Sequence, residues 1–353
     1  MSLVELPAEL LLAIAEHISW DPKHGWGSWR LLPLAQSCRY VSSSVAPLIG
    51  SSVGHHEPWP LRSALQTIHE TPSYIHRVRS IAVGMGFHIC GSECAREESN
   101  CIAPFVAQCQ HNLVHLDLYK STNELLHNLA STTDALPRLR FLSVGGDQVS
   151  LSIGAVVALT RHCPSLEALC LISLQSGDNI MIPKWSAPFR LRYLHLDAGY
   201  VDAPAFAWLC SSSVGSLEHL TIETDSGEDV EGMAWLNTDT AKKTLAVLTR
   251  LTVHFHTSLC VAHVLGYTPN LTHLTTHIDT LPALYILPPS LIGLHLDALY
   301  YYPLPDPFAF VPEGRLQQPH QIVTVSLSRS PYLGASSQDI AKACERAGLQ
   351  FCQ

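Results

Sequence analysis

The sequence predicts an α/β protein in which a short N-terminal helical module is followed by a long array of strand-and-helix repeats. Three observations indicate this fold class. Apolar residues recur at helical spacing near the N-terminus, a six-residue aliphatic pattern recurs through most of the remaining chain, and apolar helix-like segments precede several copies of that pattern. We expect a curved solenoid, with parallel strands on the concave face and helices outside.

The composition is that of a folded globular chain. The 353 residues are 47% hydrophobic and 14% charged, which is enough apolar surface for a core. The formal net charge is -9 and no run of lysine or arginine occurs, so we expect no nucleic-acid partner and no membrane partner. The eleven cysteines of a chain without a leader predict reduced thiols. We therefore expect a cytoplasmic or nuclear protein.

Residues 1–52 predict a module of short helices with apolar faces. The first helix should start near Pro7, because proline suits the first helical turn. Its apolar positions are Leu10, Leu11, Ile14 and Ile18. The apolar positions of the second helix are Leu34, Cys38, Val41 and Val45. Because the module is small, it cannot bury all of its apolar surface alone. A partner or the downstream repeats must cover the rest.

Two stretches of this module, LPAELLLAIAEHI and LLPLAQSCRYVSSSVAPLI, resemble the F-box, whose pattern begins Leu-Pro-x-Glu and later has a leucine pair and Cys-Arg. The matching positions are Leu6, Pro7, Glu9, Ile14, Leu31, Leu32, Leu34, Cys38 and Arg39. Tyr40-Val41-Ser42 replaces the tryptophan that commonly follows, and the loop between the helices is longer than usual.

In the F-box family these apolar positions insert into the Skp adaptor of a cullin-RING ubiquitin ligase. The resemblance therefore implies a Skp-type adaptor as partner. The implied adaptor-binding residues are Leu6, Pro7, Leu10, Ile14, Leu31, Leu32, Leu34 and Cys38. The alternative is a plain helical cap on the open end of the repeat array, which terminal repeats need for solubility.

The repeat signal is the hexapeptide aliphatic-x-x-aliphatic-x-aliphatic. It begins at Val78, Leu113, Leu139, Leu166, Leu191, Leu217, Leu248, Leu291 and Ile322, with an imperfect copy at Leu271. Most of the intervals between starts fall within the roughly 20 to 29 residues of a leucine-rich repeat. Proline precedes the leading leucine by two residues in LPRLRFL, CPSLEAL, TPNLTHL and PPSLIGL, where it should end the preceding helix.

The stretch from Val78 to Leu327 resembles the degenerate leucine-rich repeats that often follow F-boxes. Helices are expected at 153–161 and 203–209, and a helix then a short strand should close the array after Asp339. The predicted domains are an F-box-like module at 1–52, a linker helix within 53–77 and a repeat domain at 78–353. The apolar positions of the linker helix are Leu61, Leu65 and Ile68.

One face of the predicted sheet is rich in histidine. Side chains on a strand alternate between faces, so positions three, five and seven of each hexapeptide should lie opposite the core-facing positions four and six. Seven histidines occupy these positions: His115, His195, His219, His254, His273, His277 and His295. We expect a target protein to bind this concave face through His115, Asp117, Tyr193, His195, His219, Arg250, His273 and His295. The alternative is that solvent-facing strand positions simply accept any polar residue.

No catalytic template occurs in the sequence, so we expect an interaction protein and not an enzyme, with no cofactor. One cluster has the residue types that bind zinc: His88, Cys90, Cys94, Cys101, Cys109 and His111. Its spacings do not match paired zinc knuckles, so solvated loop residues and buried core cysteines are the favoured interpretation. We predict no metal site.

These observations together predict a substrate-recognition adaptor subunit of an SCF-type (Skp-cullin-F-box) E3 ubiquitin ligase. The N-terminal module would bind the Skp-type adaptor, and the concave repeat face would bind an unknown target protein. The alternative is a leucine-rich-repeat interaction scaffold with no role in ubiquitin transfer.

Overall fold

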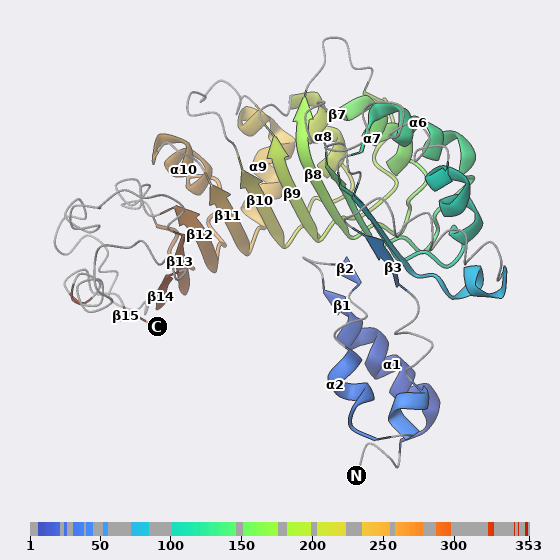
Figure 1. The fold of residues 1–353 in the computed structure, drawn as a ribbon. Coiled ribbons are helices and arrows are strands. Elements are labelled where there is room, and N and C mark those ends of the chain that lie inside the picture. Colours follow the sequence, from blue (N-terminus) through green and yellow to red (C-terminus); the bar gives the residue numbers. More distant parts are fainter. Residues whose placement is uncertain are drawn as a thin grey trace. The chain divides into compact units, whose positions relative to one another are not determined.

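The structure is a computed structural model. The residues that it describes are 6–21, 25–26, 31–38, 40–44, 52–55, 72–84, 101–119, 121–145, 151–175, 182–198, 203–223, 235–254, 258–277, 287–297, 324–327, 342, 345 and 350–351. The chain divides into two compact units, Met1–Tyr193 and Leu194–Gln353. Each unit contains a sheet of strands, and the described strands and helices of both are drawn in Figure 1.

The N-terminal module belongs to the first unit. Helix α1 (Ala8–Ser19) is followed by a small antiparallel hairpin of β1 (Trp20–Asp21) and β2 (Gly25–Trp26) and by the short helix α2 (Leu32–Ala35). Residues 40–44 form a further helical segment. The core of the module consists of Leu11, Ala15, Leu31 and Val41, all fully buried.

The single second helix expected through Leu34, Cys38 and Val41 is instead two helical segments. A turn separates them, in which the Ser37 amide donates to the Leu34 carbonyl. The apolar spacing survives because Leu34 and Cys38 still pack against the same core that contains Val41. For the described positions Leu34, Cys38 and Val41, the sequence pattern therefore predicted the face that packs on the core but not the break in the helix, and Val45 lies outside the described residues.

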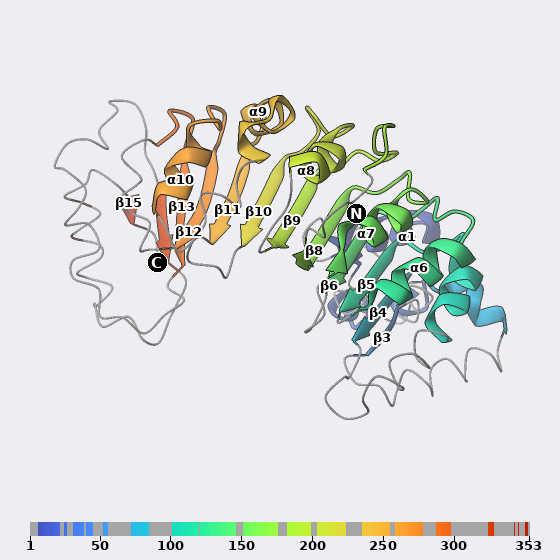
Figure 2. The ribbon, with the colours of Figure 1, turned by 90° about the horizontal axis from the view of Figure 1, so that it is seen from above.

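The sheet of the first unit is parallel. Its strands, in spatial order, are β3 (Ser52–His55), β4 (Ser80–Gly84), β5 (His115–Tyr119), β6 (Phe141–Gly145) and β8 (Ala168–Gln175), and β7 (Leu151–Ser152) pairs with β8. Helices α6 (Asn123–Thr132) and α7 (Ile153–Thr160) pack against each other, and Figure 2 shows them side by side. Residues 101–109 are also helical, and the 3-10 helix η3 (Pro72–Arg77) precedes β4.

The sheet of the second unit continues the same plan. Its strands, in spatial order, are β9 (Tyr193–Ala198, whose first residue still counts with the first unit), β10 (His219–Glu223), β11 (Arg250–His254), β12 (His273–His277), β13 (Gly293–Asp297), β14 (Thr324–Leu327) and β15 (Gln350–Phe351). The pairs from β10 to β15 are parallel. The helices are α8 (Ala203–Cys210), α9 (Asp239–Ala246) and α10 (Ser258–Leu265).

Each of the ten hexapeptides coincides with a strand. β4, β5, β6 and β8 to β14 all begin two residues after the first aliphatic residue of a hexapeptide. In every repeat with described side chains, positions one, four and six are buried, as for Leu113, Leu116 and Leu118. The predicted α/β class with parallel strands is confirmed, and so are the predicted helices at 153–161 and 203–209, which are α7 and α8.

Neighbouring repeats are joined by a hydrogen-bond unit that recurs along the chain. At the entrance to β6, the Val114 carbonyl accepts from the amides of Arg140 (2.9 Å) and Phe141 (3.1 Å). The Thr249 carbonyl accepts in the same way from the amides of Thr272 (2.9 Å) and His273 (3.1 Å). Each entering strand is therefore in register with its neighbour before the ladder proper begins.

The prolines before the strands have a different role from the one expected. Helix α7 ends at Thr160, so Pro164 does not terminate it. Pro164 instead occupies the second position of a turn in which the Leu166 amide donates to the Cys163 carbonyl at 3.3 Å, a position that suits the fixed φ of proline. The next residue, Ser165, donates to the Pro137 carbonyl of the preceding turn at 2.6 Å.

The sheet begins earlier than the domain boundary that the sequence suggested. Strand β3 pairs with β4, so the sheet reaches back to Ser52 and not only to Val78. Within the expected linker, residues 72–77 are 3-10 helix, and the predicted apolar positions Leu61, Leu65 and Ile68 lie outside the described residues. At the other end, Lys342 and Glu345 are helical and the short last strand is present as β15. None of the described helices is long and apolar enough to cross a membrane.

Candidate protein-binding surfaces

Helix α1 exposes an apolar ridge. Leu10, Ile14 and Ile18 are 51%, 37% and 38% exposed, and their spacing of four residues places them on one side of the helix. Leu11 and Ala15, which directly follow Leu10 and Ile14 in the sequence, are fully buried in the core of the module. The apolar residues that the sequence assigned to one face are therefore divided between the core and the surface, and we call Leu10, Ile14 and Ile18 the α1 ridge.

The other predicted adaptor-binding residues differ in accessibility. Pro7 is exposed, whereas Leu6, Leu34 and Cys38 are half-buried against the core. Leu31 is fully buried within that core, so it cannot contact a partner while the module is intact. The side chain of Leu32 lies outside the description.

Among the described residues of the N-terminal module, two exposed large apolar residues were not among the predicted adaptor contacts. Ile18 completes the ridge, and Tyr40 is 40% exposed while its hydroxyl donates to the Leu6 carbonyl at 2.9 Å. The four-residue spacing that continues from Leu10 through Ile14 was the signal for Ile18. Tyr40 carried no comparable signal in the sequence.

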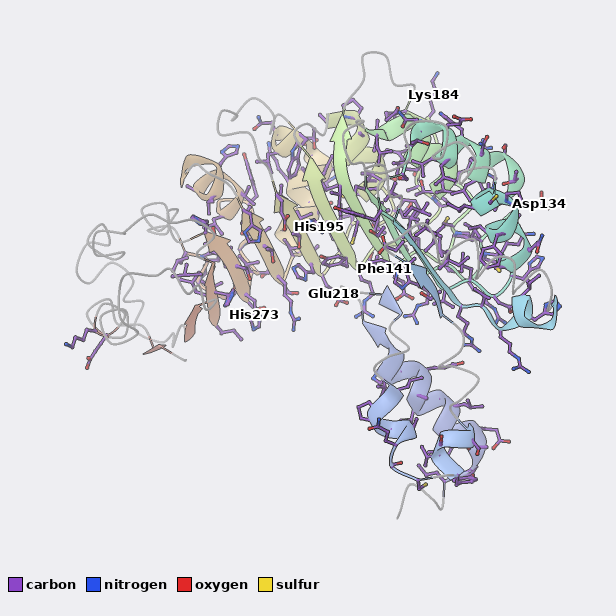
Figure 3. All side chains as sticks on the ribbon, viewed as in Figure 1. Asp134, Phe141, Lys184, His195, Glu218 and His273 are labelled. Atoms are coloured by element: carbon purple, nitrogen blue, oxygen red, sulfur yellow. The ribbon has the colours of Figure 1, made fainter. Side chains whose placement is uncertain are left out.

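On the sheet of the first unit, the face expected to bind a target is partly apolar and buried. Phe141, Ala168, Cys170 and Tyr193 form one buried cluster, and β2 lies beside β6. Figure 3 labels Phe141 on this sheet. The reason is lateral packing, because position three of successive repeats carries Phe141, Ala168 and Tyr193. Tyr193, predicted to contact a target, is only 6% exposed and belongs to this cluster.

His115, also predicted as a target contact, is likewise buried, with 6% of its surface exposed. Its ring packs edge-on against Phe141, with the ring centroids 4.6 Å apart. Asp117, two residues along the same strand, is half-buried. The predicted target contacts of the first unit thus lie on the expected face, but two of the three are covered.

The second unit brings polar side chains into lateral rows on the corresponding face. The strand register aligns His219, Arg250, His273 and Gly293 in one row. Two residues further along, it aligns Thr221, Thr252, Thr275 and His295. We call the face formed by these two rows and by His195, Glu223 and His254 the polar face. It includes five of the predicted target contacts: His195, His219, Arg250, His273 and His295.

One carboxylate on the polar face lies between two imidazoles. Oε1 of Glu223 is 3.5 Å from Nε2 of His195 and 3.8 Å from Nε2 of His254. Glu223 and His254 are direct neighbours on β10 and β11. If either ring is protonated, the Glu223 charge is neutralised locally. His195 is labelled in Figure 3.

A second histidine is fixed by hydroxyl groups. Nε2 of His219 lies 3.2 Å from Oγ1 of Thr252 and 3.5 Å from Oγ1 of Thr221. His219 is only 7% exposed, so a partner would meet its edge and not its whole ring. These two threonine hydroxyl groups thus hold the ring in place within the sheet surface.

Arg250 and His273 are the exposed members of their row. They lie opposite each other on β11 and β12. Partial burial lowers the pKa of His273, and the nearby positive charge of Arg250 lowers it further. The pair therefore combines the permanent positive charge of Arg250 with an imidazole whose protonation is disfavoured.

The described part of the cysteine and histidine cluster does not gather around one point. Cys101 is exposed and Cys109 is buried on the helical segment 101–109, and burial raises the pKa of the Cys109 thiol to about 12. His88, Cys90 and Cys94 lie outside the described residues. Among the described residues, no three histidine, cysteine or acidic side chains are grouped so that they could hold a metal ion.

A comparison with known proteins found no protein-family model that matches the chain and no curated protein that is similar to it.

Proposed function

We propose that the protein is the substrate-recognition subunit of an SCF-type ubiquitin ligase. In this proposal the α1 ridge binds a Skp-type adaptor, and the polar face of the second unit binds the target protein. The protein positions a target for ubiquitin transfer and does not carry out the chemistry itself. The F-box and leucine-rich-repeat assignments belong to this proposal, and the hexapeptide strands of the α/β fold support the second of them.

The observation that carries the proposal is the exposed α1 ridge beside a core that is already complete. Leu11, Ala15, Leu31 and Val41 fill the interior of the module without help from the ridge. Three large aliphatic side chains on one side of one helix are thus left for another surface to cover. Complete burial of such a side chain contributes roughly 1.5 to 3 kcal/mol, so the ridge can contribute substantially to binding.

The exposure of the ridge also decides which substitutions test it. Charged substitutions at Leu34 or Leu31 would disturb the core, and loss of binding would then report only unfolding. Leu10→Asp and Ile14→Asp place the charge on the surface instead. Ile292→Asp is the matched control, because Ile292 is 51% exposed in the second unit and its amide hydrogen bond does not involve the side chain.

The experiment is calorimetric titration of the full-length chain with a purified Skp-type adaptor. We expect the wild type and Ile292→Asp to bind equally, and Leu10→Asp and Ile14→Asp to bind at least about tenfold more weakly, because each buries a charge against an apolar surface. Circular dichroism of each variant checks that it remains folded. Equal affinity for all four folded proteins, or no binding by the wild type, would favour a repeat scaffold without a ubiquitin role.

A further inference from the structure

Arg250, the first residue of β11, has no ion-pair partner among the described residues, whereas Arg140 and Arg79, each one residue before a strand, are ion-paired. Arg140 forms a bidentate salt bridge with Glu167, with nitrogen–oxygen distances of 2.9 Å and 2.7 Å. Arg79 is bonded to Glu16 at 2.5 Å. The guanidinium of Arg250 is exposed on the polar face and presents a fork of donors that matches a carboxylate.

The neighbouring ring of His273 has a defined orientation. The Thr272 hydroxyl donates its single proton to the Thr249 carbonyl at 2.8 Å, so its oxygen can only accept from Nδ1 of His273, 3.0 Å away. Nδ1 therefore carries the proton in the neutral ring, and Nε2 gains one only when the imidazole becomes charged. Protonated His273 would present a new donor at Nε2.

Gly293 gives this ring its place on the sheet. A Cβ atom at Gly293 would lie 2.8 Å from Cδ2 and 3.5 Å from Nε2 of His273, so the ring occupies the space that a side chain would need. The Nε2 edge thus lies above the backbone of β13. The threonine bond on one side and the glycine on the other fix where this second donor is presented.

We infer that Arg250 and His273 together bind a carboxylate group of an acidic segment of the target protein. The inference rests on the proposed function for the identity of the ligand as a target protein. Arg250 supplies permanent charge, and His273 supplies a second donor by taking up a proton as the carboxylate arrives. An acidic ligand offsets the repulsion between the two cations, so binding and protonation favour each other.

The other charges near the pair are compatible with this ligand. His219 lies on β10 in the same row, and His277 and His295 lie further along β12 and β13. Glu218 immediately precedes β10, and Asp297 is the last residue of β13, opposite His277. Glu223 is four residues along the strand from the row, about 13 Å at the rise of a β-strand, and faces His195 and His254.

The probe for the test is a capped hexaglutamate peptide, with capped hexaglutamine as the uncharged control. Binding to the full-length chain is measured at about pH 6 and about pH 8, where histidine changes charge and glutamate does not. We expect wild type to bind hexaglutamate more tightly at the lower pH. Arg250→Gln should weaken binding roughly tenfold at both pH values, as expected for loss of a charged hydrogen bond.

The variants separate the two residues. His273→Gln should reduce the gain in affinity at low pH, while Arg138→Gln should bind like wild type, because Arg138 is an exposed arginine in the turn before β6. In nuclear magnetic resonance spectra, the titration midpoint of the His273 ring should rise when the probe is added. The inference is overturned if Arg250→Gln binds like wild type, if that midpoint does not move, or if hexaglutamate does not bind.

Two further arms identify the ligand class and keep the inference apart from the proposed function. If inorganic phosphate displaces hexaglutamate but sodium chloride at equal ionic strength does not, the site takes small anions and the carboxylate assignment is wrong. Arg250→Gln should bind the Skp-type adaptor normally. If the wild-type chain binds hexaglutamate but does not bind the adaptor, the proposed function is rejected and the anion site is retained.

Discussion

Side chains on the polar face are held by a few specific contacts, and Gly293 provides the clearest case. The close approach of His273 to the position of a Cβ atom means that a methyl group at 293 must displace the ring. Glycine within a strand otherwise costs stability through chain entropy. The two effects oppose each other, and they can be separated by changing both residues.

The first prediction concerns that pair. Gly293→Ala should stabilise the protein in a His273→Ala background but be neutral or destabilising in the wild type. The difference between the two effects should be about 0.5 to 1 kcal/mol, within the usual range for residues in contact. Urea unfolding of the four proteins measures it. Identical effects in both backgrounds would mean that the ring moves aside at no cost.

A second prediction concerns pH and His273. Its pKa in the folded state is lowered, first by burial and then by Arg250. The folded state therefore binds fewer protons than the unfolded chain, whose histidines titrate near about 6.5. The contribution of this residue to stability is complete above that pH and declines as the pH falls through it toward the folded pKa.

Urea unfolding at about pH 5.5 and about pH 7.5, on either side of the ordinary histidine pKa, checks this sign. Wild type should lose more stability on acidification than His273→Gln does, since glutamine does not titrate. The effect should be small, because the ring is exposed and solvent screens it. A larger acid sensitivity in His273→Gln would contradict the assignment.

Residue-level burial was only partly predictable from the sequence. The period of two along a strand placed the histidines on the right face. It did not show that His115 and Tyr193 are covered, because burial depends on what the neighbouring strands present. The signal was nevertheless available, since aligning the hexapeptides places Phe141 and Ala168 beside them.

Strands were the most predictable elements, because positions one, four and six of each repeat all face one core. Three of the six positions in each hexapeptide are therefore aliphatic, and each hexapeptide coincides with a strand in the structure. β3, which reads Ser-Val-Gly-His, and the two-residue strands of the hairpin carry no such pattern. Their pairing is a consequence of tertiary position, so no local signal could identify them.

A third prediction concerns the start of helix α9. Thr238 caps this helix, accepting from the Ala241 amide at 3.2 Å, and its hydroxyl donates to the Trp235 carbonyl at 2.8 Å. Thr238→Ala should lower the free energy of unfolding by about 1 kcal/mol. Thr238→Ser keeps the hydroxyl group, so it should lower the free energy of unfolding much less. Chemical denaturation compares the two. Equal losses would show that the methyl group and not the hydroxyl matters.

On the scale of the whole molecule, one chain carries two surfaces of different chemistry. The α1 ridge is apolar and belongs to the first unit, while the polar face belongs to the second. An adaptor needs such a division, because one surface must bind a common partner and the other a particular target. Substitutions on the α1 ridge should therefore leave the binding of acidic peptides unchanged.

The most direct test of the proposed function is light scattering, after size-exclusion chromatography, of the full-length chain mixed with a purified Skp-type adaptor. The account predicts a single peak whose mass equals one copy of each protein, which Ile292→Asp preserves and Ile14→Asp separates into two peaks. Separate elution of the wild-type chain and the adaptor would contradict it.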